Sequence, residues 1–378
     1  MRTPISRPRD KTERSGRSAE FLFAACQPGS ERALKNDVAR RFRDWRAAFA
    51  RPGFVTFKLS GAGADRVRLD SVFARTWGVS LGRVAAASDA ELARAVWETF
   101  TVHLGTALPE YEHLHVWQRD AALPGDEGFE PAAQAPVAAA AAAIVAARPP
   151  SAAARLAVNE VAGAGELVID CVLVGAGEWW LGRHTADAVA ARWPGGVPPL
   201  AVPPHMISRA YLKIQEALLW SELPMAAGDR CIEIGSAPGG SCLALLERGC
   251  IVTGIDPAEM DPSLLGQPRF THVRARAKDV KRSVFRDCRW LVMDANVAPN
   301  YTLDALAAIV TRPNVRPEGL LLTLKLTDPA LESRLVEIAE RIRSYGYKTV
   351  RLRQLAFNRR EICAVATDPV PHPARGSL

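Results

Sequence analysis

Four charged residues, two lysines and two acids, lie far apart in the chain. An alternating arrangement of strands and helices would bring them together. Asp294 ends one apolar run, and Lys325 lies near the end of another, LLLTLKLTD. Glu361 begins the last apolar run, and Lys213 lies in an early turn of a predicted helix at 208–223. Ligands of open α/β sheets bind beyond the carboxyl ends of the strands. The last strand is inferred to be antiparallel, so its beginning lies at that same edge, where we expect all four residues to converge.

The chemistry of this Lys-Asp-Lys-Glu set suits methylation of a ribose 2′-hydroxyl. That hydroxyl is a poor nucleophile and needs a base or a strong polarising group beside it. A second lysine and partial desolvation are expected to lower the pKa of Lys325 toward neutrality, so that it takes the proton while the oxygen attacks a sulfonium methyl in line. Asp294 and Glu361 would orient the lysines and balance their charge. Each residue alone could equally be a surface charge or an ion pair; the combination favours catalysis.

A glycine-rich turn follows the apolar run at 231–234, in the string CIEIGSAPGG. Gly235 allows a tight turn, and Gly239 and Gly240 would let a ligand approach the backbone. Asp256 ends the next strand, where a carboxylate can accept hydrogen bonds from both hydroxyls of a ribose. By itself the string could be no more than a tight turn.

The spacing of the turn separates two cofactor classes. It is GxxxGG with Pro238 inside, whereas dinucleotide-binding turns follow GxGxxG. S-adenosylmethionine has no phosphate and presents a carboxylate, a ribose and an adenine, so it fits this turn better than NAD. Asp279, past the third strand, is placed to meet the adenine edge, or is a solvated aspartate at the start of a helix.

The pattern from residue 208 onward predicts a Rossmann-like α/β domain with a mostly parallel, seven-stranded sheet and one antiparallel strand. Its strands are predicted at 231–235, 251–256, 270–274, 290–294, 319–326, 348–354 and 361–367. Helices are predicted at 208–223, 302–310 and 329–345. A short turn between the last two strands makes them a hairpin.

The rest of the chain divides into smaller parts. We expect a disordered basic tail at 1–19, a small α/β unit at 20–88, a second unit at 89–192, a Pro- and Gly-rich linker at 193–207, the catalytic domain at 208–370 and a tail at 371–378. The helix of the first small unit is predicted at 31–42 with Ser30 as its cap. The alanine-rich stretch at 132–147 fits a helix or a low-complexity insertion.

Composition narrows the class of protein. The 378 residues carry a net charge of +7, which favours anionic partners such as nucleic acid without specifying them. Seven cysteines without a CxxC pair indicate reduced, buried thiols in a cytoplasmic protein. His113 and His115 lie in one apolar stretch with no Cys or acidic cluster near them, so we predict no metal site. We predict neither a membrane span nor a secretory signal.

The strings that carry the site resemble those of the FtsJ-like ribose 2′-O-methyltransferases. They are SRAYLKIQEA (208–217), IEIGSAPGGS (232–241), GIDPAEM (254–260), WLVMDAN (290–296), LTLKL (322–326) and NRREICAV (358–365). Within that group the chain most resembles the ribosomal RNA large subunit methyltransferase M family. The strings CQPGSE (26–31) and FARTW (73–77) are similar to the N-terminal unit of that family.

The resemblance implies a ferredoxin-like unit and a THUMP-like RNA-binding domain ahead of the catalytic domain, and a cytidine of 23S ribosomal RNA as the target. It implies proton acceptance by Lys325, supported by the other three members of the set. It also implies S-adenosylmethionine contacts at Gly235, Ala237, Pro238, Gly239, Gly240, Asp256, Asp279 and Asp294.

Two other functions stay open at this point. One is 2′-O-methylation of another RNA, such as a tRNA, an snRNA or an mRNA cap, although we find no pocket for a cap guanine in the sequence. The other is a non-catalytic RNA-binding protein that retains the fold. Whichever of these functions holds, we expect a cytoplasmic, monomeric protein.

Overall fold

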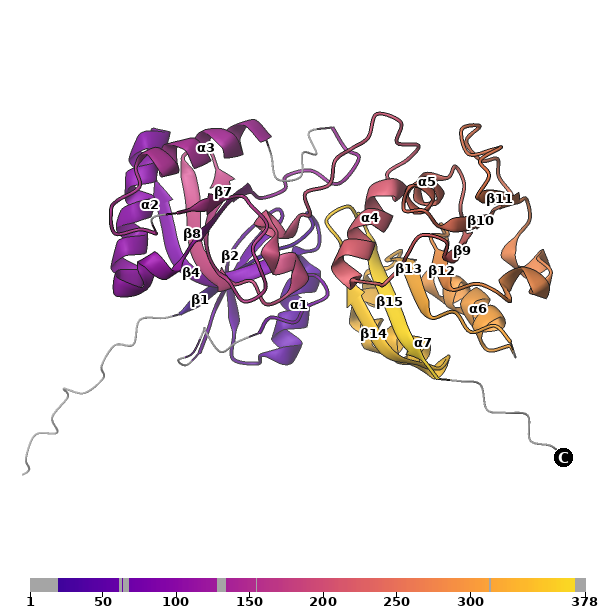
Figure 1. Ribbon diagram of the computed structural model, residues 1–378. Helices are drawn as coiled ribbons and strands as arrows, with labels where there is room; N and C mark the ends of the chain where they lie inside the picture. Colours follow the sequence, from indigo (N-terminus) through magenta and orange to yellow (C-terminus); the bar gives the residue numbers. More distant parts are fainter. Residues whose placement is uncertain are drawn as a thin grey trace, which may run out of the picture.

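The computed structural model describes residues 20–60, 63, 68–127, 134–153, 155–312 and 314–370. The tails predicted at 1–19 and 371–378 lie outside these residues. Two α/β units lie side by side, the N-terminal one mostly in indigo to magenta and the C-terminal one from pinkish red through orange to yellow (Figure 1).

The N-terminal unit is built on one eight-stranded sheet with the order β2-β3-β1-β4-β8-β7-β5-β6. Its strands are β1 (Phe21–Ala25), β2 (Arg46–Arg51), β3 (Phe54–Lys58), β4 (Thr76–Ala85), β5 (His113–Gln118), β6 (Ala157–Val158), β7 (Leu167–Gly175) and β8 (Glu178–Thr185). Its helices are α1 (Glu31–Arg41), α2 (Asp89–Leu104) and α3 (Gln134–Ala146). The alanine-rich stretch therefore contains a helix, one of its two predicted forms.

The boundary predicted near residue 88 falls inside this continuous sheet. Strand β4 pairs with β1 on one side and with β8 on the other, so the sheet joins the two small units that the sequence suggested. Their assignment as ferredoxin-like and THUMP-like stays a prediction. Strand β2 was not predicted. Ser30 does precede α1, but its side chain makes no capping hydrogen bond, contrary to our expectation.

The C-terminal unit has the predicted seven-stranded sheet, in the order β11-β10-β9-β12-β13-β15-β14. Only β15 runs antiparallel to its neighbours, which confirms the closing hairpin. The strands are β9 (Arg230–Ile234), β10 (Ile251–Ile255), β11 (Phe270–Val273), β12 (Trp290–Met293), β13 (Gly319–Lys325), β14 (Tyr347–Arg353) and β15 (Glu361–Pro369). The helices are α4 (Ala210–Ser221), α5 (Gly240–Glu247), α6 (Pro299–Val310) and α7 (Leu335–Ser344).

Helices cover both faces of this sheet. Helices α4 and α5 share one apolar cluster with the side chains of one face, and α6 and α7 share another with the opposite face. Strands buried on both faces read as continuous apolar runs, which is why the central strands were found from the sequence. In β13 every residue is buried except the last one, Lys325.

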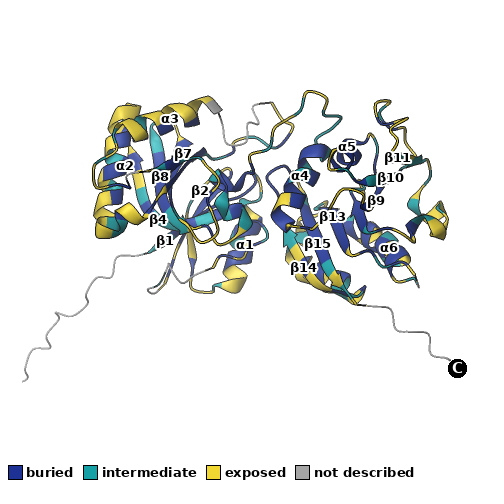
Figure 2. Cartoon of the chain, viewed as in Figure 1, coloured by how far each residue is buried: buried dark blue, intermediate teal, exposed yellow. Residues whose placement is uncertain are grey.

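The two units share a core. One apolar cluster contains Leu34 and Phe73 of the N-terminal unit together with Ile342 and Val350 of the C-terminal unit. Figure 2 shows buried residues on the facing sides of both units. In the predicted linker Trp193 is buried as well and belongs to the cluster of α4 and α5.

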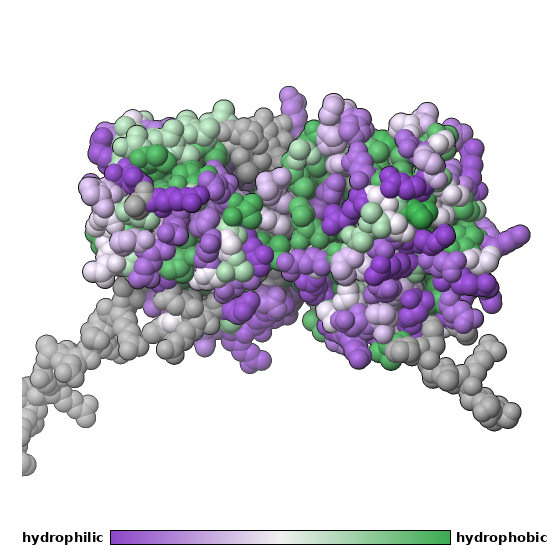
Figure 3. All heavy atoms as spheres, in the orientation of Figure 1, coloured by the Kyte–Doolittle hydropathy of each residue, from purple (hydrophilic) through white to green (hydrophobic). Residues whose placement is uncertain are grey.

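All seven cysteines are buried and unpaired, as predicted. Among the described residues, no helix has the length and apolarity needed to cross a membrane. On the face drawn in Figure 3, hydrophilic residues predominate and hydrophobic ones are scattered among them.

Candidate active site

The structure brings the four predicted charged residues together at the carboxyl edge of the C-terminal sheet. Asp294 follows the last residue of β12, and Lys325 is the last residue of β13. Glu361 begins β15 directly opposite Lys325 in the antiparallel pairing. Lys213 lies in the first turn and a half of α4. The topological argument from the sequence therefore placed these residues correctly.

Asp294 and Glu361 hold the two lysines between them. Lys213 Nζ donates to Asp294 Oδ2 at 2.5 Å and lies 3.6 Å from Glu361 Oε1. Lys325 Nζ donates to Asp294 Oδ1 and to Glu361 Oε1, each at 2.9 Å. Each side chain keeps 11–15% of its surface exposed. Buried ion pairs need such mutual hydrogen bonds, because desolvation would otherwise outweigh their attraction.

The charges of the four groups stabilise one another. Burial alone would raise the pKa of Asp294 and of Glu361, but the two nearby lysines lower both pKa values below their ordinary range. Burial lowers the pKa of Lys325, but attraction to Asp294 and Glu361 outweighs it, and the net pKa is raised above 10.5. Our expectation of a lowered pKa for Lys325 is therefore wrong for this structure. That expectation rested on burial and on the neighbouring lysine, whereas attraction to the two acids has the larger effect on the pKa.

The glycine-rich turn lies directly beside Asp294. Gly235 has φ +80°, and a Cβ there would lie 2.8 Å from the carbonyl oxygen of Asp294. A side chain at Gly239 would overlap Leu264, and one at Gly240 would overlap Ser208. The last two glycines are therefore required by close packing within the protein, in addition to any ligand that their backbone would contact.

Asp256 closes the turn on its other side. Its Oδ2 accepts a hydrogen bond from Ala237 N at 3.3 Å and its Oδ1 accepts one from Ala258 N at 2.8 Å. Pro238 follows Ala237 through a cis peptide bond. Asp279 is exposed in a single 3-10 turn after β11.

The sequence did not reveal several buried polar residues around this edge. Glu233 is buried in β9, and burial raises its pKa to about 8. Glu216 is buried in α4, three residues after Lys213, and Gln27 of the N-terminal unit reaches the same region. An acid inside an otherwise apolar strand or helix face was the available signal for Glu233 and Glu216, whereas Gln27 had none. No cluster of three metal-binding side chains occurs in the described part of the chain.

Fold and site together define the class of this domain. A seven-stranded sheet with one antiparallel strand carries a glycine-rich turn after its first strand and a Lys-Asp-Lys-Glu set at the same edge. Residues 206–343 match the family model described as FtsJ-like methyltransferase. Over these residues the C-terminal unit is similar to FtsJ-like methyltransferase domains. Glu361 lies beyond the matched residues.

The names of curated relatives also state the RNA on which those proteins act. The chain is 29% identical over 196 residues to the ribosomal RNA large subunit methyltransferase M of Azoarcus sp., covering 50% of this chain and 53% of that protein. It is 32% identical over 181 residues to the protein of the same name from Aromatoleum aromaticum, covering 46% and 49%. The chain thus spans about half the length of the relatives it matches. Among solved structures, TrmN from Thermus thermophilus is 15% identical with a TM-score of 0.34, covering 92% of this chain and 99% of that one.

Proposed function

We propose that this protein transfers a methyl group from S-adenosylmethionine to a ribose 2′-hydroxyl of structured RNA, with a cytidine of 23S ribosomal RNA as the target. The observation that carries the proposal is the Lys213, Asp294, Lys325 and Glu361 set, held within hydrogen-bond distance beside the glycine-rich turn. The curated relatives, named for the large-subunit RNA, support the choice of ribosomal RNA.

The residues of the turn fit S-adenosylmethionine, which when bound supplies a methyl group on a positively charged sulfur. Helix α5 begins after Gly239 without a side-chain cap, so its first backbone N–H groups are available for a carboxylate. The hydroxyl of Ser208, next to Gly240, is buried and has no hydrogen-bond partner among the described residues. Asp256 would hold the ribose hydroxyls, and Asp279 would meet the adenine.

The four charged residues would handle the proton of the acceptor hydroxyl. In its neutral form Lys325 would accept this proton as the ribose oxygen takes up the methyl group, which the bound cofactor would give up from its sulfur to leave a neutral thioether. Asp294 and Glu361 then stabilise the ammonium that results, because both already bond to Lys325 Nζ. Lys213 Nζ, bonded to the other oxygen of Asp294, keeps that carboxylate in place. General-base catalysis of this kind contributes about 10²- to 10⁴-fold to a rate.

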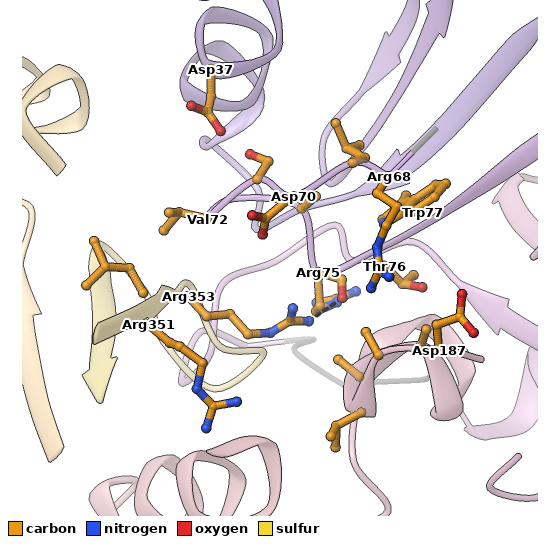
Figure 4. A pocket seen from close by; sticks show the side chains of 18 of the residues that line it. Asp37, Arg68, Asp70, Val72, Arg75, Thr76, Trp77, Asp187, Arg351 and Arg353 are labelled. Atoms are coloured by element: carbon orange, nitrogen blue, oxygen red, sulfur yellow. Dashed lines mark hydrogen bonds between the residues drawn. The ribbon is translucent and has the colours of Figure 1, made fainter. Parts of the chain in front are cut away.

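A basic cleft between the two units supports an RNA substrate. It has a volume of about 1580 Å³ and is lined by nine arginines but only five acids. The arginines are Arg40, Arg41, Arg68, Arg75, Arg183, Arg192, Arg343, Arg351 and Arg353. Figure 4 shows Arg353 from β14 and Arg75 from the N-terminal unit reaching toward each other across it. An excess of arginine is typical of surfaces that bind phosphate backbones.

The cleft lies beside the charged set. Its lining contains Trp220 near the end of α4, two helical turns after Lys213, whereas none of the four charged residues lines it. Two turns of helix span about 10 Å. A strand of RNA bound in the cleft would therefore need to extend about 10 Å along α4 to present its ribose to Lys325.

Transfer of labelled methyl groups tests the proposal. Full-length protein, tritiated S-adenosylmethionine and unmodified 23S ribosomal RNA should give 2′-O-methylcytidine, and Lys325→Met should lower the single-turnover rate by about 10²- to 10⁴-fold. Lys348→Met, at an exposed position of β14, is the matched control and should behave as wild type. Calorimetric binding of S-adenosylmethionine should be equal in all three proteins. Unimpaired transfer by Lys325→Met contradicts the mechanism, and label in tRNA alone contradicts the ribosomal target.

A further inference from the structure

The loop at 354–360, between β14 and β15, is held by a side chain of the N-terminal unit. Gln27 follows β1 and is 1% exposed. Its Nε2 donates to the carbonyl oxygens of Leu355 at 2.9 Å, Ala356 at 2.5 Å and Asn358 at 2.7 Å. Reversal of the amide would put Oε1 against three carbonyl oxygens, so the chemistry of the loop fixes its orientation.

The same loop is held from the catalytic unit by Glu216 of α4. The two carboxylate oxygens accept hydrogen bonds from Ala356 N at 2.8 Å and Phe357 N at 2.9 Å. Gln27 thus binds backbone acceptors of the loop and Glu216 binds its donors. Residues three apart on a helix share a face, so Glu216 faces the loop from the side of α4 that carries Lys213.

The loop leads directly into Glu361. Arg359 N donates to Glu361 Oε2 at 3.0 Å, while Oε1 bonds to Lys325. Arg360 O accepts from Leu326 N at 2.7 Å, which ties the end of the loop to the residue after Lys325. A displacement of the loop would therefore move Glu361 relative to Lys325.

A second contact from the N-terminal unit reaches this loop. Asp126, in the segment after β5, accepts a hydrogen bond from Arg359 Nη2 at 2.7 Å. Gln354 N, at the beginning of the loop, donates to the carbonyl of Val72 at 2.8 Å. Both ends of the loop and its centre are therefore bound to the N-terminal unit, with the buried amide of Gln27 at the centre.

We infer that Gln27 is a positioning residue for methyl transfer: by holding the loop at 354–360 it aims Glu361 at Lys325, so the N-terminal unit completes the active site. This inference rests on the proposed function. It assigns the N-terminal unit a part in the chemical step, in addition to any part in binding RNA. The rate of chemistry then depends on the docking of the two units.

Substitution of Gln27 in the full-length protein separates this role from RNA binding. Gln27→Met keeps the length of the side chain and removes the donor. We expect its single-turnover rate to fall about 10- to 100-fold, since displacements of about 1 Å at a reacting group have effects of this size. The KM for RNA and the affinity for S-adenosylmethionine should stay within about twofold of wild type.

A double-mutant cycle identifies the route of the effect. If Gln27 acts through Glu361, then Gln27→Met combined with Glu361→Gln should be no slower than Glu361→Gln alone. Full multiplication of the two losses would show that Gln27 acts by another route, and would overturn the inference.

A second variant and hydrogen exchange serve as controls for loss of activity through misfolding. Thr56→Val removes a partly buried hydrogen bond within the N-terminal sheet, which Thr56 Oγ1 accepts from Phe49 N, and should leave the rate unchanged. Gln27→Glu should impair transfer at least as much as Gln27→Met, because a carboxylate would face three carbonyl oxygens. Amides at 355–361 should exchange faster in both Gln27 variants, and those of β11 should not.

The outcomes distinguish the two proposals. A wild-type protein that methylates no RNA refutes the proposed function, while the exchange data still report whether Gln27 holds the loop. An active wild type with equally active Gln27→Met and Gln27→Glu variants refutes the positioning role alone.

Discussion

Lys325 and Glu361 stand opposite each other in the antiparallel pairing of β13 and β15, and their side chains meet at 2.9 Å between Nζ and Oε1. The backbone register of the sheet thus sets the central ion pair of the site. A shift of one residue in this register would turn the side chain of one partner to the other face of the sheet. The sheet therefore fixes the backbone positions of both residues, and the hydrogen bonds to Asp294 and Glu361 hold Lys325 Nζ.

The raised pKa of Lys325 predicts an alkaline pH dependence of methyl transfer. Asp294 and Glu361 face the ammonium group of Lys325, and Lys213 lies on the other side of these two acids. The pKa of Lys325 is raised above 10.5. If the neutral amine accepts the proton, the single-turnover rate with saturating RNA should rise about tenfold per pH unit without a plateau below about pH 10. Glu361→Gln removes one attraction, lowers the pKa of Lys325 and should move the profile to lower pH. A wild-type plateau near neutral pH would contradict proton acceptance by Lys325 in this state.

Asp256 should control the affinity for S-adenosylmethionine. Its carboxylate is half-buried beside the glycine-rich turn and accepts hydrogen bonds from Ala237 N and Ala258 N. Loss of hydrogen bonds to a charged group costs about 1.5–3 kcal/mol, so Asp256→Ala should weaken calorimetric binding by about 10- to 100-fold. Asp261→Ala alters a half-exposed carboxylate five residues later, which bonds to Ser263 instead of the turn, and is the control. Equal affinities for the two variants would place the cofactor elsewhere.

The basic cleft should contribute ionic contacts to RNA. Arg68 is exposed in its lining, so a phosphate can reach its guanidinium. For Arg68→Gln we expect weaker binding of 23S ribosomal RNA fragments in filter assays at 0.1 M salt, and a salt dependence of log Kd that is smaller by about one unit. Arg94→Gln, at an exposed position of α2, is the charge-matched control. Identical salt slopes for Arg68→Gln and wild type would argue against RNA in the cleft.

Glu216 should make the stability of the protein decline between acidic and neutral pH. Burial raises its pKa from 4.5 to about 7, although Ala356 and Phe357 donate to its carboxylate. The stability contributed by a raised pKa is fully present below the unfolded value of 4.5 and is lost as pH rises through the folded value of about 7. This group should therefore lower the free energy of unfolding by up to about 3 kcal/mol between pH 4.5 and pH 8.

Urea unfolding at pH 5 and pH 8, followed by tryptophan fluorescence, measures this decline. Glu216→Gln cannot titrate and should show a smaller difference between the two pH values than wild type. Glu361→Gln is the control, because the lowered pKa of Glu361 contributes stability that is lost only as pH falls below the unfolded value of 4.5, so its difference between pH 5 and pH 8 should match that of wild type. An equal pH dependence for wild type and Glu216→Gln would show that the pKa of Glu216 is not raised in the folded protein.

The sequence by itself determined the catalytic half of the fold and the location of the charged set. Central strands such as β9 and β13 are buried on both faces and therefore read as unbroken apolar runs. Once their order along the chain is known, chain topology assigns Asp294, Lys325 and Glu361 to one edge, because parallel strands end there and an antiparallel strand begins there. This inference needed no side-chain distance.

Only the tertiary structure decided how these residues affect one another and what supports them. The pKa of Lys325 depends on which charges lie within a few ångströms, and the two acids at 2.9 Å outweigh its burial. Gln27 and the loop that it binds are separated by more than 300 residues, and no local pattern records such a contact. Periodicity reports which face of an element is buried, whereas long-range hydrogen bonds depend on how the two units dock.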